Sequence, residues 1–328
     1  MLTALDNWMA RHPWHPRITP MIVYVVLLLP VQLLTDGPAW TLWLYPVLYA
    51  VQCGVVAWML WRSRRLTPEL NVRFHWLAVP VGVGVVVAWV ALGRWMVELA
   101  PGWFGPGDDQ HYFVRMREQS AGLYWASLSL RLAGMAVLVP LFEELFVRSL
   151  LLRSFHRPRK VALGVLQIVA DMPVVGEWFE GTRLGQRVIH RGPVFGPEFQ
   201  SVPLGALSLC GVAVSTFLFT LNHIPRDWPA CVVCGIAYCL LVGATNQWGR
   251  GKGEGVRGQE SGDRDRESGA SQAVPSPAAP PAPMVPAEPR TPNPDPRSLG
   301  LGPVVWAHAI TNALLWYYCI AWNDWQFM

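Results

Sequence analysis

Charged residues are scarce in this chain. Only 15% of the 328 residues are Asp, Glu, Lys or Arg, whereas soluble globular chains carry roughly 25%. Hydrophobic residues make up 52%, and the mean hydropathy is +0.27. The net charge is only +4, and the basic residues form no continuous face, which excludes a nucleic-acid-binding protein. The apolar excess also excludes disorder over most of the chain.

Several sequence features of common soluble proteins are also missing. All six cysteines lie inside apolar stretches rather than in loops, which argues against a disulfide scaffold. We find no internal repeat, Walker loop, dinucleotide-binding fingerprint or nucleophile elbow. We also expect no cleavable signal peptide, because no small-residue cleavage pattern follows the first apolar stretch. The function must therefore be sought in other residue patterns.

Long apolar stretches dominate the sequence, and a transmembrane helix needs about 20 such residues. The predicted spans are residues 19–36, 38–61, 75–97, 132–152, 203–223, 228–247 and 301–321. Eighteen tryptophans agree with this prediction, because Trp favours membrane–water interfaces. The sequence therefore predicts an all-α polytopic membrane protein of about seven transmembrane helices with a buried catalytic cluster.

Loop charge and composition define the predicted organisation. Arginines follow the second and fourth spans, and Arg250 and Lys252 follow the sixth, which places these loops and the N-terminus in the cytoplasm. Residues 248–300 are rich in Pro, Gly and Ser and predict a disordered linker. The predicted segments are a cytoplasmic N-terminal segment (1–18), transmembrane helices 1–4 (19–154), a cytoplasmic insert (155–201), transmembrane helices 5–6 (202–247), the linker (248–300), and transmembrane helix 7 with the C-terminal tail (301–328).

The fourth predicted span holds three ionisable residues, each of which costs ~2.5–3.5 kcal/mol at a helix centre. Glu144 and Arg148 are four residues apart, so they share a helical face and can form an ion pair. Glu143 points about 100° away and has no local partner. Its charge must be met by another helix, or the carboxyl must stay protonated. Arg131 and Arg153 bracket the span, as expected of arginines at the lipid headgroups.

Two further spans carry polar side chains that complement the carboxylates. Phe219 and His223 share a face of the fifth span, and His308 and Asn312 share a face of the seventh. Carboxylates, imidazoles and an amide suffice for a hydrolytic site. In one chemistry, Glu143 is a general base that activates water, and the histidines and the amide assist.

In the other chemistry, Glu143, His223 and His308 hold a zinc ion that activates the water. The sequence lacks the HExxH pattern of zinc proteases. The predicted orientation also places Glu143 near mid-membrane, His308 toward the cytoplasm and His223 near the outer end of its span. Both chemistries stay open at this point.

The motifs EExxxR (Glu143–Arg148), FxxxH (Phe219–His223) and HxxxN (His308–Asn312), in this order on three apolar helices, resemble the type II CAAX prenyl endopeptidase family. This family is also known as CAAX proteases and bacteriocin-processing enzymes. The stretch Phe199–Gly205 and the ending Trp325–Phe327 are similar to the prokaryotic branch found with exosortase sorting systems. Residues 155–197 and 248–300 look like insertions relative to the compact family pattern.

The resemblance implies a glutamate-dependent intramembrane endopeptidase without a metal cofactor, in the cytoplasmic membrane of a bacterium. The implied roles are the base for Glu143, a water-holding partner for His223, oxyanion donors for His308 and Asn312, and a supporting pair for Glu144 and Arg148. The expected partners are the lipid bilayer, a protein or peptide substrate, and exosortase-type sorting machinery. Alternative functions are a non-catalytic membrane partner of a sorting or export system and a proton-coupled carrier.

Overall fold

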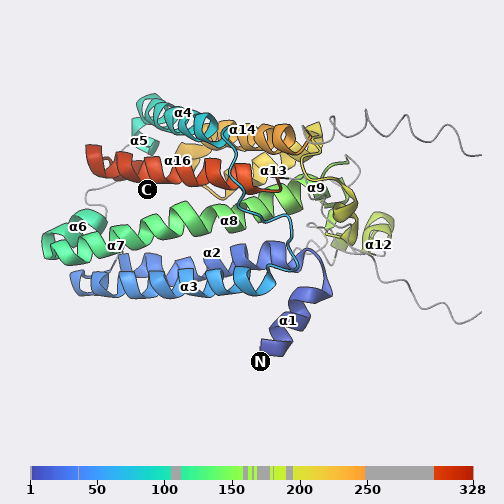
Figure 1. The fold of residues 1–328 in the computed structure, drawn as a ribbon, viewed down its shortest axis with the longest axis horizontal. Coiled ribbons are helices and arrows are strands. Elements are labelled where there is room, and N and C mark those ends of the chain that lie inside the picture. The colour runs from blue at the N-terminus through green and yellow to red at the C-terminus, as the bar shows by residue number, and fades with distance from the viewer. Residues whose placement is uncertain are drawn as a thin grey trace, which may run out of the picture.

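The computed structural model shows an all-helical bundle whose long helices lie side by side (Figure 1). Residues 2–35, 37–104, 112–157, 162–164, 166–167, 178–179, 181–189, 195–247 and 299–327 are described. No strand occurs among them, which confirms the all-α prediction. The predicted linker 248–300 lies outside the described residues apart from its last two positions, so its disorder stays a prediction.

Four helical segments are long and apolar enough to cross a membrane. A fifth is present if α1 (Leu2–Arg11) and α2 (His15–Thr35), bent by 119° at their junction, count as one span. The four segments are η1–α3 (Ala39–Leu44 and Tyr45–Ser63), α4 (Ala78–Leu99), η5–α14 (Pro225–Asp227 and Trp228–Gln247) and α16 (Gly302–Trp322). These helices mark the chain as a membrane protein.

The fourth predicted span lies in one continuous helical run, drawn in green in Figure 1. The run consists of α7 (Ala121–Ala133), η2 (Gly134–Leu138), α8 (Val139–Glu144), η3 (Leu145–Leu151) and α9 (Leu152–Ser154). Its charged side chains distinguish it from the four apolar helices. The fifth predicted span is shorter than expected, because α13 covers only Leu209–Leu221 and begins at the N-cap Ser208.

The outward faces of the long helices are apolar. On α2, Val26, Leu29 and Leu33 are 56%, 60% and 75% exposed, and Val87 on α4 is 64% exposed. The helices also bury apolar side chains between them, so they are apolar on both sides. Water-facing helix surfaces are normally polar. This pattern is therefore typical of a bundle surrounded by lipid.

Short helices and connecting segments cover the two ends of the bundle (Figure 1). One end carries α5 (Pro101–Phe104) and α6 (Tyr112–Gln119), and the other carries α12 (Arg183–Ile189). Two further short helices are η4 (Pro197–Ser201) and η6 (Trp325–Phe327).

The link between α3 and α4 packs against the start of α16. Leu301 N donates to Glu69 O at 2.9 Å, and Trp306 Nε1 donates to Val72 O at 2.9 Å. A Cβ atom at Gly302 would lie 2.3 Å from Arg73 O, so this close approach requires glycine. The link therefore fixes the end of α16 from which His308 projects.

Candidate functional site

The two adjacent glutamates lie at the end of α8, between the π-helical stretches η2 and η3. Pro140 lies inside the continuous run, where its missing N–H removes one hydrogen bond from the helical backbone. Glu144 is fully buried and Glu143 is 8% exposed. Single π-helical turns inside α-helices occur frequently at functional sites. The two carboxylates therefore lie beside π-helical backbone, which is frequent at functional sites.

Glu144 pairs with Arg148, as their spacing of four residues predicts. Arg148 Nε lies 3.2 Å from Glu144 Oε2, and both side chains are completely buried. The guanidinium group also lies 5.2 Å from the ring centre of Phe219 and 5.5 Å from that of Tyr238. Aromatic faces attract cations. Phe219 of the FxxxH motif therefore packs against Arg148 of the EExxxR motif.

His308 of α16 lies between the two carboxylates. Its Nδ1 is 2.8 Å from Glu144 Oε1, a hydrogen bond, and its Nε2 is 3.8 Å from Glu143 Oε2. The second distance is longer than a hydrogen bond but within range of an ion pair. We refer to Glu143, Glu144, Arg148 and His308 as the Glu143–His308 cluster.

Two groups of this cluster lie outside the ion pair. Arg148 pairs with Glu144, which leaves Glu143 and His308 facing each other in a buried site. A carboxyl and an imidazole placed in this way are suited to acid–base chemistry.

Asn312 reaches a different part of the run. Its Nδ2 donates to Met135 O in η2 at 2.8 Å. Asn312 and His308 stand on the same side of α16, as predicted, but they contact different residues. Asn312 therefore links α16 to the π-helical stretch that precedes α8.

The contacts of His223 lie apart from the Glu143–His308 cluster. Its Nδ1 donates to Phe219 O at 2.9 Å, and its ring centre lies 4.6 Å from Phe219 and 5.7 Å from Trp89. Among the described residues, no hydrogen bond or ion pair joins it to Glu143, Glu144 or His308. The neighbour that the structure gives Glu143 is therefore His308, not His223.

Two polar residues beside His308 escaped the sequence analysis. Tyr238 Oη is 2.7 Å from Thr311 Oγ1, and the Tyr238 ring centre lies 5.5 Å from that of His308. Thr311 Oγ1 is also within hydrogen-bond distance of the carbonyl oxygens of Gly82 and Ala307. A signal was present, because Thr311 falls inside the HxxxN motif. These contacts join α14, α16 and α4 around the imidazole.

The zinc alternative requires a suitable set of ligands. Across the part of the chain that the structure describes, no group of three or more His, Cys, Asp or Glu side chains is placed to hold a metal ion. His308 and Glu143 are close together, but the third predicted ligand, His223, makes the separate contacts given above.

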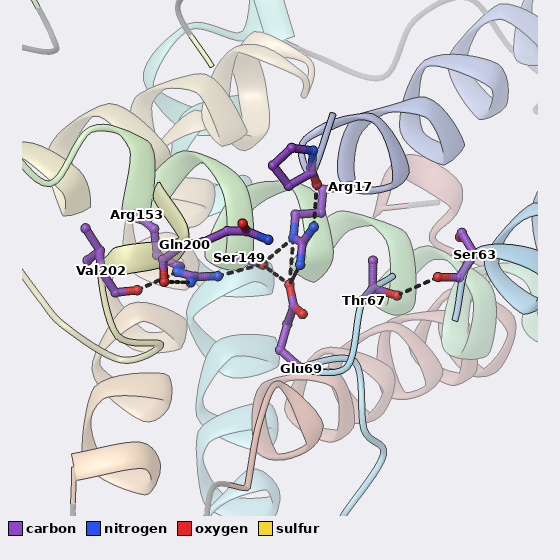
Figure 2. Close-up of polar contacts among 9 residues, drawn as sticks. Arg17, Ser63, Thr67, Glu69, Ser149, Arg153, Gln200 and Val202 are labelled. Carbon is purple, nitrogen blue, oxygen red and sulfur yellow. Dashed lines mark hydrogen bonds and ion pairs between the residues drawn. The ribbon is translucent and has the colours of Figure 1, made fainter. Parts of the chain in front are cut away.

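A second buried cluster lies further along the same helical run (Figure 2). Glu69 Oε1 is 2.7 Å from Arg17 Nε and accepts a hydrogen bond from Ser149. Arg153 donates to Ser149 Oγ at 3.4 Å. It also donates to the carbonyls of Val202 and Gln200, at 2.8 and 3.1 Å.

We call Arg17, Glu69, Ser149 and Arg153 the Arg17–Arg153 cluster. Arg153 is only 9% exposed, because the carbonyls of the 200–202 segment and the hydroxyl of Ser149 satisfy its donors inside the protein. Its position at the lipid headgroups stays a prediction.

No family model, curated protein or solved structure matches this chain. The resemblance to CAAX proteases therefore stays a prediction that depends on the motifs and on the geometry of the cluster.

Proposed function

We propose that the protein is a glutamate-dependent intramembrane endopeptidase that hydrolyses a peptide bond of a membrane-associated protein or peptide. The observation that supports this most is the position of His308 between Glu143 and Glu144. Two distant helices bring a carboxylate, an imidazole and a second carboxylate together in a buried site. Resemblance to the type II CAAX family agrees with this proposal.

In the proposed reaction, Glu143 is the general base. Its carboxylate takes a proton from water as the water oxygen bonds to the scissile carbonyl carbon. The C–N bond then breaks, and the proton passes through Glu143 or His308 to the departing amine. Glu144 accepts the hydrogen bond of His308 Nδ1, which orients the ring and directs Nε2 toward Glu143. General acid–base catalysis of this kind contributes typically 10²–10⁴-fold.

Asn312 and His223 keep the roles that the resemblance implies. Each has one more hydrogen-bonding group than the contacts given above use. The Asn312 amide carries two hydrogens, and Met135 O uses one of them. His223 uses Nδ1 for Phe219 O, which leaves Nε2 to hold water. We assign Asn312 as oxyanion donor and His223 as a water-holding group on this basis.

We also propose seven membrane passes in a bacterial cytoplasmic membrane, formed by α2, α3, α4, the α7–α9 run, α13, α14 and α16. The placement of α5 and α6 at one end of the bundle and α12 at the other supports this topology (Figure 1). Single cysteines near residues 68 and 255 should react with an impermeant thiol reagent only from the cytoplasmic side. A cysteine near residue 105 should react only from outside, and the reverse pattern would contradict the topology.

The function is tested in cells by comparing peptide termini in membranes that contain the wild-type protein or Glu143→Gln. Termini produced by the enzyme should disappear in Glu143→Gln and persist in the control Glu98→Gln, which removes an exposed carboxylate at the end of α4. Identical termini in all three membranes would contradict the protease proposal and favour a carrier or a non-catalytic partner. Termini that depend on Glu143 would identify the substrate and show whether it belongs to a sorting system of the exosortase type.

A further inference from the structure

The N-terminal helix α1 and the end of α3 border a half-open cavity. The 119° bend after α1 turns this helix away from α2. At the bend, the Trp8 ring stacks on His15 with ring centres 3.9 Å apart. The cavity between α1 and α3 has a volume of about 240 Å³. Its lining residues are Leu5, Asp6, Met9, Ala10, Met59, Arg62, Ser63, Arg65 and Leu66.

The lining combines an apolar wall with excess positive charge. Met9 and Met59 are both 4% exposed, so the apolar wall is well packed. Arg62 is paired with Asp6 at 2.5 Å, the one acidic residue of the lining. Arg65 is exposed and has no ion pair among the described residues. The cavity thus offers a guanidinium group to an anion that also carries apolar surface.

The surroundings of the cavity are typical of a membrane interface. Trp8, Trp58 and Trp61 are 37%, 37% and 58% exposed, and tryptophan is enriched at the headgroup level. The end of α3 is also the end of an apolar helix long enough to span the membrane. An anionic lipid presents a phosphate at this depth, and its acyl chains extend toward the apolar span.

We propose that this cavity binds the headgroup of an anionic phospholipid. Arg65, together with Arg62, binds the phosphate, because the guanidinium fork matches phosphate oxygens. The glycerol end of the lipid lies against Met9, Met59 and Leu66. This inference rests on the membrane placement of the chain and is independent of the proposed protease activity.

The neighbouring Arg64 provides a matched control. Its Nη1 donates to Trp61 O at 2.7 Å, and its guanidinium lies 4.7 Å from the centre of the Trp61 ring. It is exposed, has the same charge as Arg65 and does not line the cavity. Arg64→Gln and Arg65→Gln therefore change the net charge equally, but only Arg65→Gln changes the lining of the cavity.

The test is native mass spectrometry of the full-length protein titrated with dioleoyl-phosphatidylglycerol or dioleoyl-phosphatidylcholine. We expect tighter binding of phosphatidylglycerol. Arg65→Gln should weaken it at least about tenfold, because it removes a hydrogen bond between two charged groups. Arg64→Gln should weaken it less than twofold.

A second pair of variants tests the cavity without changing charge. Ala10→Phe places a ring in the cavity and should also weaken phosphatidylglycerol binding, whereas Ala4→Phe, on the same helix but outside the lining, should not. Equal losses of phosphatidylglycerol binding in Arg64→Gln and Arg65→Gln would show that the lipid is attracted by the overall positive charge and not by the cavity. That result would overturn the proposal. Equal binding of the two lipids, or displacement of phosphatidylglycerol by equimolar inorganic phosphate, would also overturn it.

Discussion

The Glu143–His308 cluster and the Arg17–Arg153 cluster each include residues of the α7–α9 run but differ in how their polar atoms are satisfied. In the Arg17–Arg153 cluster, every guanidinium nitrogen of both arginines has an oxygen partner. In the Glu143–His308 cluster, Arg148 Nε and Nη1 and Glu144 Oε2 make no hydrogen bond within the described structure, although the two groups form an ion pair.

This difference agrees with the proposal that one cluster is structural and the other reactive. A buried polar atom without a hydrogen bond costs about 1–3 kcal/mol. Such atoms also occur elsewhere among the described residues, for example at Tyr45, Tyr49 and Arg131. The position of His308 between two carboxylates is what distinguishes the Glu143–His308 cluster. We interpret the Arg17–Arg153 cluster as a structural link between α2, the α3–α4 link and η3–α9.

The largest effect on stability is expected from Glu144→Gln. This change leaves Arg148 without its carboxylate while both side chains stay fully buried. Breaking a buried ion pair costs about 3–5 kcal/mol. The thermal midpoint in detergent should fall sharply, and activity should be lost with it.

The double variant Glu144→Gln/Arg148→Met is the control for that prediction. Removing both partners of a buried pair is often close to neutral for stability. The double variant should therefore regain most of the lost thermal stability and remain inactive, because His308 then faces a neutral amide in place of the carboxylate. A double variant as unstable as Glu144→Gln would show that the unpaired charge of Arg148 does not cause the loss of stability.

A smaller effect is expected from Glu69→Gln in the Arg17–Arg153 cluster. Glu69 is the carboxylate partner of Arg17, but Ser149 Oγ and Pro13 O remain as acceptors. We expect destabilisation of about 1–3 kcal/mol. Activity per folded molecule should stay within twofold of wild type. A selective loss of activity without loss of stability would contradict the structural interpretation of this cluster.

The smallest effect is expected from Ser149→Ala. The Ser149 hydroxyl accepts from Arg17 at 3.1 Å and from Arg153 at 3.4 Å, and it donates to Glu69. Each arginine keeps other partners, so the loss should be about 1 kcal/mol. The thermal midpoint should fall by less in Ser149→Ala than in Glu69→Gln, and the opposite order would require a larger role for the hydroxyl.

Local spacing predicted part of both the fold and the site. The apolar stretches predicted the helical class, and four of them correspond to helices that can span a membrane. The spacing of Glu144 and Arg148 predicted their ion pair, because residues four apart share a helical face. The same argument placed His308 and Asn312 on one side of α16.

Contacts between distant segments could not be predicted in this way. His308 and Glu144 are separated by 164 residues, and only the packing of α16 against α8 brings them together. The π-helical stretches on either side of α8 were likewise not predicted from the sequence. Glu69 lies in a polar link, where nothing in the sequence distinguishes a partly buried carboxylate from an exposed one.

Cleavage of the identified substrate by purified Glu143→Gln, normalised to folded protein and compared with Glu69→Gln, tests the central claim most directly. Glutamine keeps the shape of Glu143 but cannot accept the proton of water. The account predicts a rate at least about 10²-fold below wild type, an unchanged thermal midpoint, and near-normal cleavage by Glu69→Gln. A Glu143→Gln enzyme that folds and cleaves at the wild-type rate would contradict the assignment of Glu143 as the base.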